Sequence, residues 1–144
     1  MNGCHTVVIS DVHIGSPFCR HELFLKFLDA LRPGTTVVFN GDTIDNPCRP
    51  LSEIDQLLVG RIEDLANRCT VVWLPGNHDS ECRPCNSEAI SYHDTYTIAN
   101  RLLVAHGHQF DVVKAQHRLF IKSFRAFYRV WMMLTRQSMH EAQF

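Results

Sequence analysis

Three short apolar segments, separated by segments with helical periodicity, most constrain the fold of this chain. Each of the three is β-branched and apolar without alternation, which is typical of a strand buried on both faces; they are residues 6–10, 35–40 and 70–74. Residues 21–34 and 52–67, which lie between them, carry apolar side chains at helical spacing. The order β-α-β-α-β predicts an α/β fold in which helices cover a parallel sheet.

The two helical segments are each expected to bury one apolar face. The first ends at Pro33-Gly34, and the second begins after Ser52, a residue type that caps helices. The expected apolar faces consist of Leu23, Phe24, Phe27, Leu28 and Leu31 in the first helix and of Ile54, Leu57, Leu58, Ile62 and Leu65 in the second.

Beyond residue 80 the pattern changes to a polar loop, a hairpin and a long helix. Residues 95–99 and 101–105 are predicted to pair as a hairpin around Asn100-Arg101. Residues 114–136 form a predicted amphipathic helix with an aromatic stripe and a basic stripe. Its apolar face is expected to pack on a core, and peripheral contact with an anionic membrane surface is the alternative interpretation.

Composition suits one domain, 1–144, because 45% of 144 residues are hydrophobic. Residues 1–100 hold 7 basic and 13 acidic side chains, a balance that favours cation binding, whereas residues 101–144 hold 7 basic and 2 acidic ones. The six cysteines follow no secretory signal, so we expect reduced thiols and a cytoplasmic protein. Cys82 and Cys85 have CxxC spacing without a second pair, which favours incidental thiols over a zinc site.

Polar clusters follow the three buried strands and the second strand of the predicted hairpin. The ends of neighbouring strands meet at one edge of a sheet, with about 4.8 Å between strands, and ligands bind there in open α/β folds. The residues concerned are Asp11 and His13, Asp42 and Asp45, Asn77, His78 and Asp79, and finally His106 and His108.

Carboxylate, imidazole and amide donors together are typical of a divalent metal centre. A carboxylate such as Asp42 can bridge two ions, and a metal pair about 3.5–4 Å apart is suited to phosphoryl transfer. Each cluster alone also has an ordinary interpretation, as a strand-end cap, a turn or a core histidine. Four clusters at four strand ends favour the metal centre.

The motifs D-x-H, GD-x-x-D, GNHD and HG, in this order, resemble the signature of calcineurin-like metallophosphoesterases. The resemblance extends over essentially the whole chain. The segments ISDVHIGSPFCRHELFLKFL, NGDTID, PGNHD and HGHQFDVV are most similar to the UDP-2,3-diacylglucosamine pyrophosphatase-like branch. That branch cleaves a lipid-linked nucleotide pyrophosphate in lipid A synthesis.

The resemblance implies a role for each matching residue. Asp11 and His13 would bind the first metal ion and Asp42 would bridge to the second, whose further ligands would be Asn77 and His106. The ions implied are Mn first, with Fe, Zn, Ni or Mg as alternatives.

The resemblance also places His78 beside the reacting phosphate, as a stabiliser of the transition state or as the proton donor to the leaving group. Asp79 would orient His78, and Asp45 would contact the metal ligands without binding the metal itself. His108 stands where the branch has Asp, so it is either tolerated or an extra ligand.

The family closes its site with a later GHxH block, which does not follow His108 here. We therefore expect an αββα sandwich whose second half is incomplete, truncated at its C-terminus relative to the family. The implied function is hydrolysis of a phosphoester or pyrophosphate bond by a dinuclear metal-activated hydroxide, with a UDP-linked acylated sugar lipid as substrate. The alternative is an inactive, truncated or scaffold-type binding protein. We see no pattern of basic and aromatic residues that is specific for nucleic acid.

Overall fold

A computed structural model describes residues 5–80, 83, 88–110 and 127. The chain divides into two compact units, Met1–His108 and Gln109–Phe144, and the site described below lies in the first. Except for Phe127, the predicted helix 114–136 and its membrane contact lie outside the described residues, as do Cys82 and Cys85. In the part of the chain that is described, no helix is long and apolar enough to cross a membrane.

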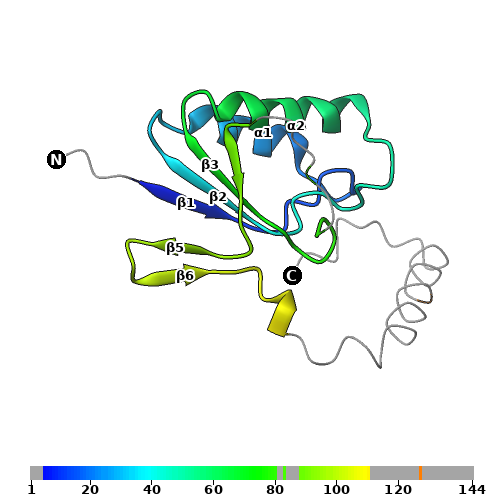
Figure 1. Cartoon of the computed structure of the whole chain (residues 1–144). Coiled ribbons are helices and arrows are strands. Elements are labelled where there is room, and N and C mark those ends of the chain that lie inside the picture. Colours follow the sequence, from blue (N-terminus) through cyan, green and yellow to red (C-terminus); the bar gives the residue numbers. More distant parts are fainter. Residues whose placement is uncertain (1–4, 81–82, 84–87, 111–126, 128–144) are drawn as a thin grey trace, which may run out of the picture. The chain divides into compact units, whose positions relative to one another are not determined.

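A parallel four-stranded sheet, in the order β1-β2-β3-β4, forms the centre of the first unit (Figure 1). The three strands expected from the sequence are confirmed as β1 (Thr6–Ile9), β2 (Thr36–Asn40) and β3 (Thr70–Leu74), with Val37 paired to Val7 and to Val71. The edge strand β4 (Ile90–Tyr92) was not predicted. It is only three residues long and buries only Ile90, so it lacks the apolar run that marks the others.

Two helices, α1 (His21–Ala30) and α2 (Glu53–Leu65), cover the same face of this sheet (Figure 1). This follows from the strand order, because successive right-handed crossovers in one direction leave their helices on one side. Ser52 caps α2 as predicted, in a capping box with Asp55. The core on this side combines helix and strand side chains, among them Leu28, Leu58, Ile62, Phe39 and Trp73.

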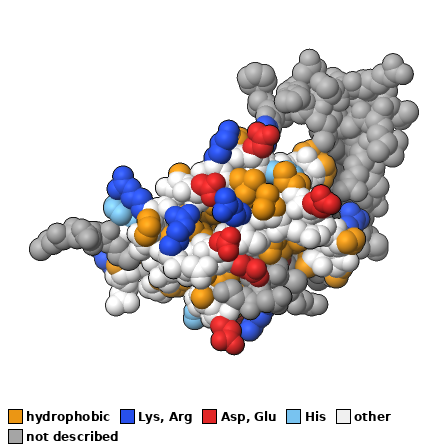
Figure 2. Space-filling model, turned by 90° about the horizontal axis from the view of Figure 1, so that it is seen from above, with side chains coloured by type: hydrophobic (Ala, Val, Ile, Leu, Met, Phe, Trp, Pro, Cys, Tyr) orange, Lys and Arg blue, Asp and Glu red, His pale blue; other side chains and the backbone are white. Residues whose placement is uncertain are grey.

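The buried faces of the helices are narrower than the sequence predicted. Leu28, Leu58, Ile62 and Leu65 are buried as expected. The prediction was wrong for four other apolar residues, since a helix lying on a sheet buries only a stripe of its surface. Figure 2 views the molecule from the side on which α1 and α2 lie, and it shows hydrophobic side chains among charged ones of both signs on this outer surface. The exposed residues are Leu23, Phe27, Ile54 and Leu57.

An antiparallel hairpin, β5 (Tyr96–Ile98) with β6 (Leu102–Val104), packs on the other face of the sheet (Figure 1). Val104 lies in a second core cluster with Val38, Val72 and Leu74. The turn differs slightly from the predicted Asn100-Arg101, because Ala99 and Asn100 hold the positive φ angles, 49° and 55°. A short 3-10 helix, η1 (His108–Phe110), follows. The α/β class and the β-α-β-α-β order are confirmed.

Candidate metal centre

The segments that follow β1 and β2 continue side by side past the ends of the strands. The Asp11 N–H donates to the Gly41 carbonyl oxygen at 3.2 Å, and the His13 N–H donates to the Asp42 carbonyl oxygen at 3.0 Å. These backbone hydrogen bonds bring two polar clusters, separated by about thirty residues in sequence, to one place at the carboxyl edge of the sheet.

Three of the candidate ligands have a left-handed backbone. The φ angles are 57° at Asp11, 51° at His13 and 50° at Asp42. Residues other than glycine adopt this region rarely, and such conformations are concentrated at functional sites, where surrounding contacts hold them in place. The residues with these unusual φ angles therefore lie at the same carboxyl edge of the sheet as the polar clusters.

Asp42 is the centre of the cluster, and its side chain is buried. Its Oδ1 accepts a hydrogen bond from the His78 N–H at 2.9 Å and lies 3.6 Å from Nε2 of His106. Its Oδ2 lies 3.9 Å from Nε2 of His78 and 4.0 Å from Nε2 of His13. The three imidazole separations exceed the usual hydrogen-bond length. They suit two ligands of one ion, each of which lies about 2.0–2.2 Å from the metal.

The other ring nitrogen of each imidazole is already engaged. Nδ1 of His106 lies 2.8 Å from the Asn40 carbonyl oxygen, and Nδ1 of His78 lies 2.7 Å from the Asp45 carbonyl oxygen. Nδ1 of His13 lies 3.1 Å from Oδ1 of Asp45. A carbonyl oxygen can only accept, so Nδ1 of His106 and of His78 carries the hydrogen and Nε2 presents its lone pair to the shared carboxylate. This is how proteins fix the tautomer of a metal-binding histidine.

Two groups of donor atoms meet at Asp42. One consists of His13, Asp42 and His78, and the other of Asp11, Asp42 and His106; within each group the donor atoms all lie within 4.8 Å of one another. The donors are nitrogen and oxygen, which fits a divalent ion of the manganese-to-zinc series. The grouping differs from the one implied by the resemblance, since Asp11 falls with His106, although its Oδ1 is also 3.9 Å from Nε2 of His13.

Two glycines leave the space that these side chains occupy. A Cβ atom on Gly41, whose φ is +78°, would lie 2.4 Å from the ring of His106. A Cβ atom on Gly76 would lie 2.1 Å from Oδ1 of Asp42. Real Cβ atoms essentially never approach other atoms so closely, so any larger residue would displace the candidate ligands. The glycines before Asp42 and Asn77 therefore let the candidate ligands approach the backbone closely, and they also let the chain turn after each strand.

The Asp79 carboxylate forms hydrogen bonds with the backbone of two loops rather than with an imidazole ring. Its fully buried carboxylate accepts three backbone hydrogen bonds, from Gly76 at 2.7 Å, Thr43 at 2.9 Å and Ile44 at 3.2 Å. It thereby ties the segment after β3 to the segment after β2. The expected contact with the imidazole of His78 is not among these bonds, and a backbone carbonyl holds that ring instead.

Among the described histidines and carboxylates, His108 belongs to neither donor group, and Asn77, whose donor would be an amide oxygen, stays a predicted ligand. Asn77 is exposed and directly precedes His78. The ring of His108 lies 5.5 Å from that of His106, measured between centroids. The sequence analysis missed His93 and Asp94, which follow β4 as the other clusters follow their strands. Recognising residues 90–92 as a strand would have found them.

A family model and solved structures match this chain. No curated protein sequence matches the chain. Among solved structures, the nuclease MPE of Pseudomonas putida is similar, with 23% sequence identity and a TM-score of 0.47 over 65% of this chain. The matched part is 50% of the nuclease, so the chain spans about half of that protein's length. A family model described as calcineurin-like phosphoesterase matches residues 5–138, which is nearly the whole chain. The chain therefore belongs to the calcineurin-like phosphoesterase family.

Proposed function

We propose that this protein hydrolyses phosphate esters with the help of divalent ions bound around Asp42. One observation carries the proposal: three imidazoles, those of His13, His78 and His106, direct Nε2 toward a single buried carboxylate while Nδ1 of each is held elsewhere. Membership of the calcineurin-like phosphoesterase family supports the choice of reaction.

Ions at such a site lower the pKa of bound water and neutralise charge on the phosphoryl oxygens. The chain's own residues then have separate tasks. His106, whose side chain is only 9% exposed, and buried Asp42 hold the centre. His78 is 25% exposed and adjoins Asn77, so we assign it the contact with the reacting phosphate, as the resemblance implies. Its Nδ1–H, donated to the Asp45 carbonyl oxygen, fixes the ring with Nε2 3.9 Å from Oδ2 of Asp42, at the edge of the centre.

A finer proposal concerns the substrate and the metal. The similarity of the GNHD and HGHQFDVV segments to the UDP-2,3-diacylglucosamine pyrophosphatase-like branch supports a UDP-linked acylated sugar lipid as substrate and Mn as the preferred ion. Contact of the basic and aromatic segment 114–136 with the inner membrane surface, where such a lipid would be met, belongs to the same proposal.

The test uses the full 144-residue chain, bis(p-nitrophenyl) phosphate, and Mn²⁺, Mg²⁺, Zn²⁺ or Ni²⁺ in turn. We expect turnover that requires a metal and is abolished by a chelator. His78→Ala should lower kcat by about 100-fold or more, the usual effect of losing a proton-transferring side chain. The exposed His5, changed to Ala, is the matched control and should leave kcat unchanged. A chain that binds metal but turns over no phosphate ester would contradict the proposal and favour a binding protein.

A further inference from the structure

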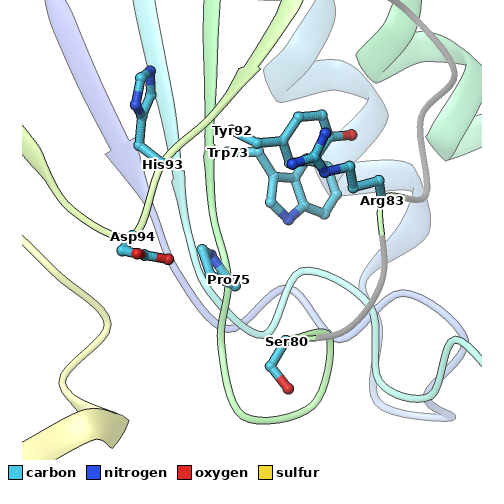
Figure 3. A pocket seen from close by; sticks show the side chains of 7 residues that line it. All are labelled: Trp73, Pro75, Ser80, Arg83, Tyr92, His93 and Asp94. Atoms are coloured by element: carbon cyan, nitrogen blue, oxygen red, sulfur yellow. The ribbon is translucent and has the colours of Figure 1, made fainter.

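The two sides of the candidate metal centre differ in their surroundings. At the carboxyl ends of β3 and β4 there is an open polar cavity of about 500 Å³, and two of its lining residues, Pro75 and Ser80, bracket the segment 76–79 (Figure 3). On the side of β1, the segment that carries Asp11 and His13 instead reaches the first turn of α2. The candidate ligands on this second side therefore depend on contacts with a helix.

The backbone of His13 needs contacts on both sides to keep its conformation. Its φ of 51° lies in the left-handed region, which is unfavourable for a residue with a side chain. Its N–H donates to the Asp42 carbonyl oxygen at 3.0 Å, and its own carbonyl oxygen accepts from the Ser16 N–H at 3.0 Å. Release of the chain after His13 would let φ return to an ordinary value, and the imidazole would turn away from Asp42.

Asp55 supplies a contact just after His13. Its Oδ1 accepts a hydrogen bond from the Gly15 N–H at 3.1 Å, although the two residues are 40 positions apart. The same oxygen lies 2.8 Å from Nε2 of His21, the first residue of α1. Asp55 is only 6% exposed. A buried carboxylate with several fixed partners has little freedom to move, so it holds Gly15 firmly.

The capping box of α2 does not require the bond to Gly15. A capping box needs the side chain at this position to accept from the backbone N–H of the cap. Oδ2 of Asp55 does so, from the Ser52 N–H at 3.2 Å. Oδ1 faces two groups outside α2, which are Gly15 and His21. The two oxygens thus have separate partners, and only one of them is occupied with the start of the helix.

We propose that Asp55 is a positioning residue of the metal centre, which holds His13 in its left-handed conformation through the Gly15 N–H. This action runs through the backbone, whereas Asp45 contacts the ring of His13 directly. The inference deepens the proposed function and rests on its metal centre. It concerns metal affinity, which can be measured without turnover.

The test compares Mn²⁺ affinities by calorimetric titration of the full 144-residue chain. Asp55→Ala removes the acceptor of the Gly15 N–H, and we expect one of two ions to bind about tenfold more weakly, the usual effect of one hydrogen bond. Ser52→Ala is the matched control, because it breaks the same capping box and leaves the bond to Gly15. It should lower the midpoint of urea denaturation, as loss of an N-cap does, and leave both affinities unchanged.

A double-mutant cycle identifies the ion that Asp55 affects. His13→Ala removes the imidazole that Asp55 positions, so the addition of Asp55→Ala should weaken binding no further. His106→Ala leaves that imidazole in place, so Asp55→Ala should keep its tenfold effect on the ion held with His13. A merely structural role of Asp55 would weaken binding equally in both backgrounds.

Three outcomes would overturn the inference. They are an unchanged affinity in Asp55→Ala, an equal loss of affinity in Ser52→Ala, and a full further loss when Asp55→Ala is added to His13→Ala. Should Asp55→Ala show no cooperative unfolding in urea, Asp55→Asn takes its place. Its single carbonyl oxygen must serve both the Gly15 and Ser52 amides, so Mn²⁺ affinity should fall about threefold, and an unchanged affinity would again overturn the inference.

Failure of the inference can be told apart from failure of the proposed function. A chain whose Mn²⁺ affinity depends on Asp55 as described, but which hydrolyses no ester, would contradict the proposed function alone. Metal-dependent hydrolysis with parent affinity in the Asp55 variants would contradict the positioning role alone. A parent chain without a Mn²⁺ site would contradict both.

Discussion

Nε2 of His106 lies 3.6 Å from Oδ1 of Asp42, a separation too long for a hydrogen bond and suited to two ligands of one ion. The opposite nitrogen of the same ring is held by a backbone carbonyl oxygen of β2. Oδ2 of the same carboxylate faces His13 and His78 in a similar way. Asp42 is thus the one group common to both sets of candidate metal ligands.

Replacing Gly76 with Ala should damage the metal centre and the fold together. The new Cβ atom would lie 2.1 Å from Oδ1 of Asp42, so the carboxylate or the loop must move. We expect a loss of about 1–3 kcal/mol in the free energy of unfolding, as in other overpacked sites. Mn²⁺ affinity should fall as well. Urea denaturation and calorimetric titration measure the two effects.

Gly60→Ala is the matched control, because Gly60 lies inside α2 and its added Cβ atom would meet nothing within 4 Å. This variant should gain about 0.5–1 kcal/mol of stability from helix propensity and keep its metal affinity. Equal behaviour of the two variants would contradict the close approach of Gly76 to Asp42.

Asp45→Ala should weaken metal binding by releasing the ring of His13. Oδ1 of Asp45 lies 3.1 Å from Nδ1 of His13, so its removal frees the ring to rotate. Loss of such an orienting partner costs about 10–100-fold in metal affinity. Asp45→Asn retains an acceptor oxygen and should restore most of it. If Asn and Ala at this position bind Mn²⁺ equally poorly, the role of Asp45 is electrostatic rather than orienting.

Asp79→Asn should lower the stability of the protein and leave the orientation of the His78 imidazole largely unchanged. The carboxylate accepts three backbone hydrogen bonds in a fully buried position, and an amide nitrogen cannot accept. We expect a loss of about 2–3 kcal/mol in the free energy of unfolding, measured in urea. Asp64→Asn, an exposed position of α2, should stay within about 0.5 kcal/mol of the parent. A near-neutral Asp79→Asn would show that the loop contacts contribute little.

Asp55 makes stability depend on acid pH. Burial alone would raise the pKa of Asp55. Hydrogen bonds from the side chains of Ser52 and His21 and from the Gly15 amide outweigh that effect, so the pKa of Asp55 lies below its ordinary value of 3.8. A depressed folded-state pKa contributes stability above the unfolded pKa and loses it as pH falls through the folded pKa. The difference in unfolding free energy between the parent and Asp55→Asn should therefore shrink as pH falls below 3.8. A difference that is constant from pH 6 to pH 2.5 would contradict this.

Much of this arrangement could be predicted because the sheet is parallel. Unbroken β-branched runs marked β1, β2 and β3, and parallel strands end at one edge, so the polar residues after them had to meet. The structure brings Asp11, His13 and Asp42 together there, with His78 and His106. Their roles as metal ligands stay predictions.

The rest depends on contacts that no sequence pattern reveals. β4 is too short to show a period, and with it His93 and Asp94 were missed. The pairing of His106 with the Asn40 carbonyl oxygen is a tertiary contact between residues 66 positions apart. Whether Asp79 would meet a ring or three backbone amides depended on the path of two loops, which the motif GNHD does not specify.

The most direct test of the account is a calorimetric titration of the 144-residue chain with Mn²⁺, in parallel with Asp42→Asn. Since Asp42 belongs to both donor groups, we predict two bound ions per parent chain and a loss of about 100-fold or more in affinity at both sites in the variant. Asp29→Asn, an exposed carboxylate of α1, should bind as the parent does. Two tight sites that survive Asp42→Asn, or no tight site in the parent, would contradict a metal centre built around Asp42.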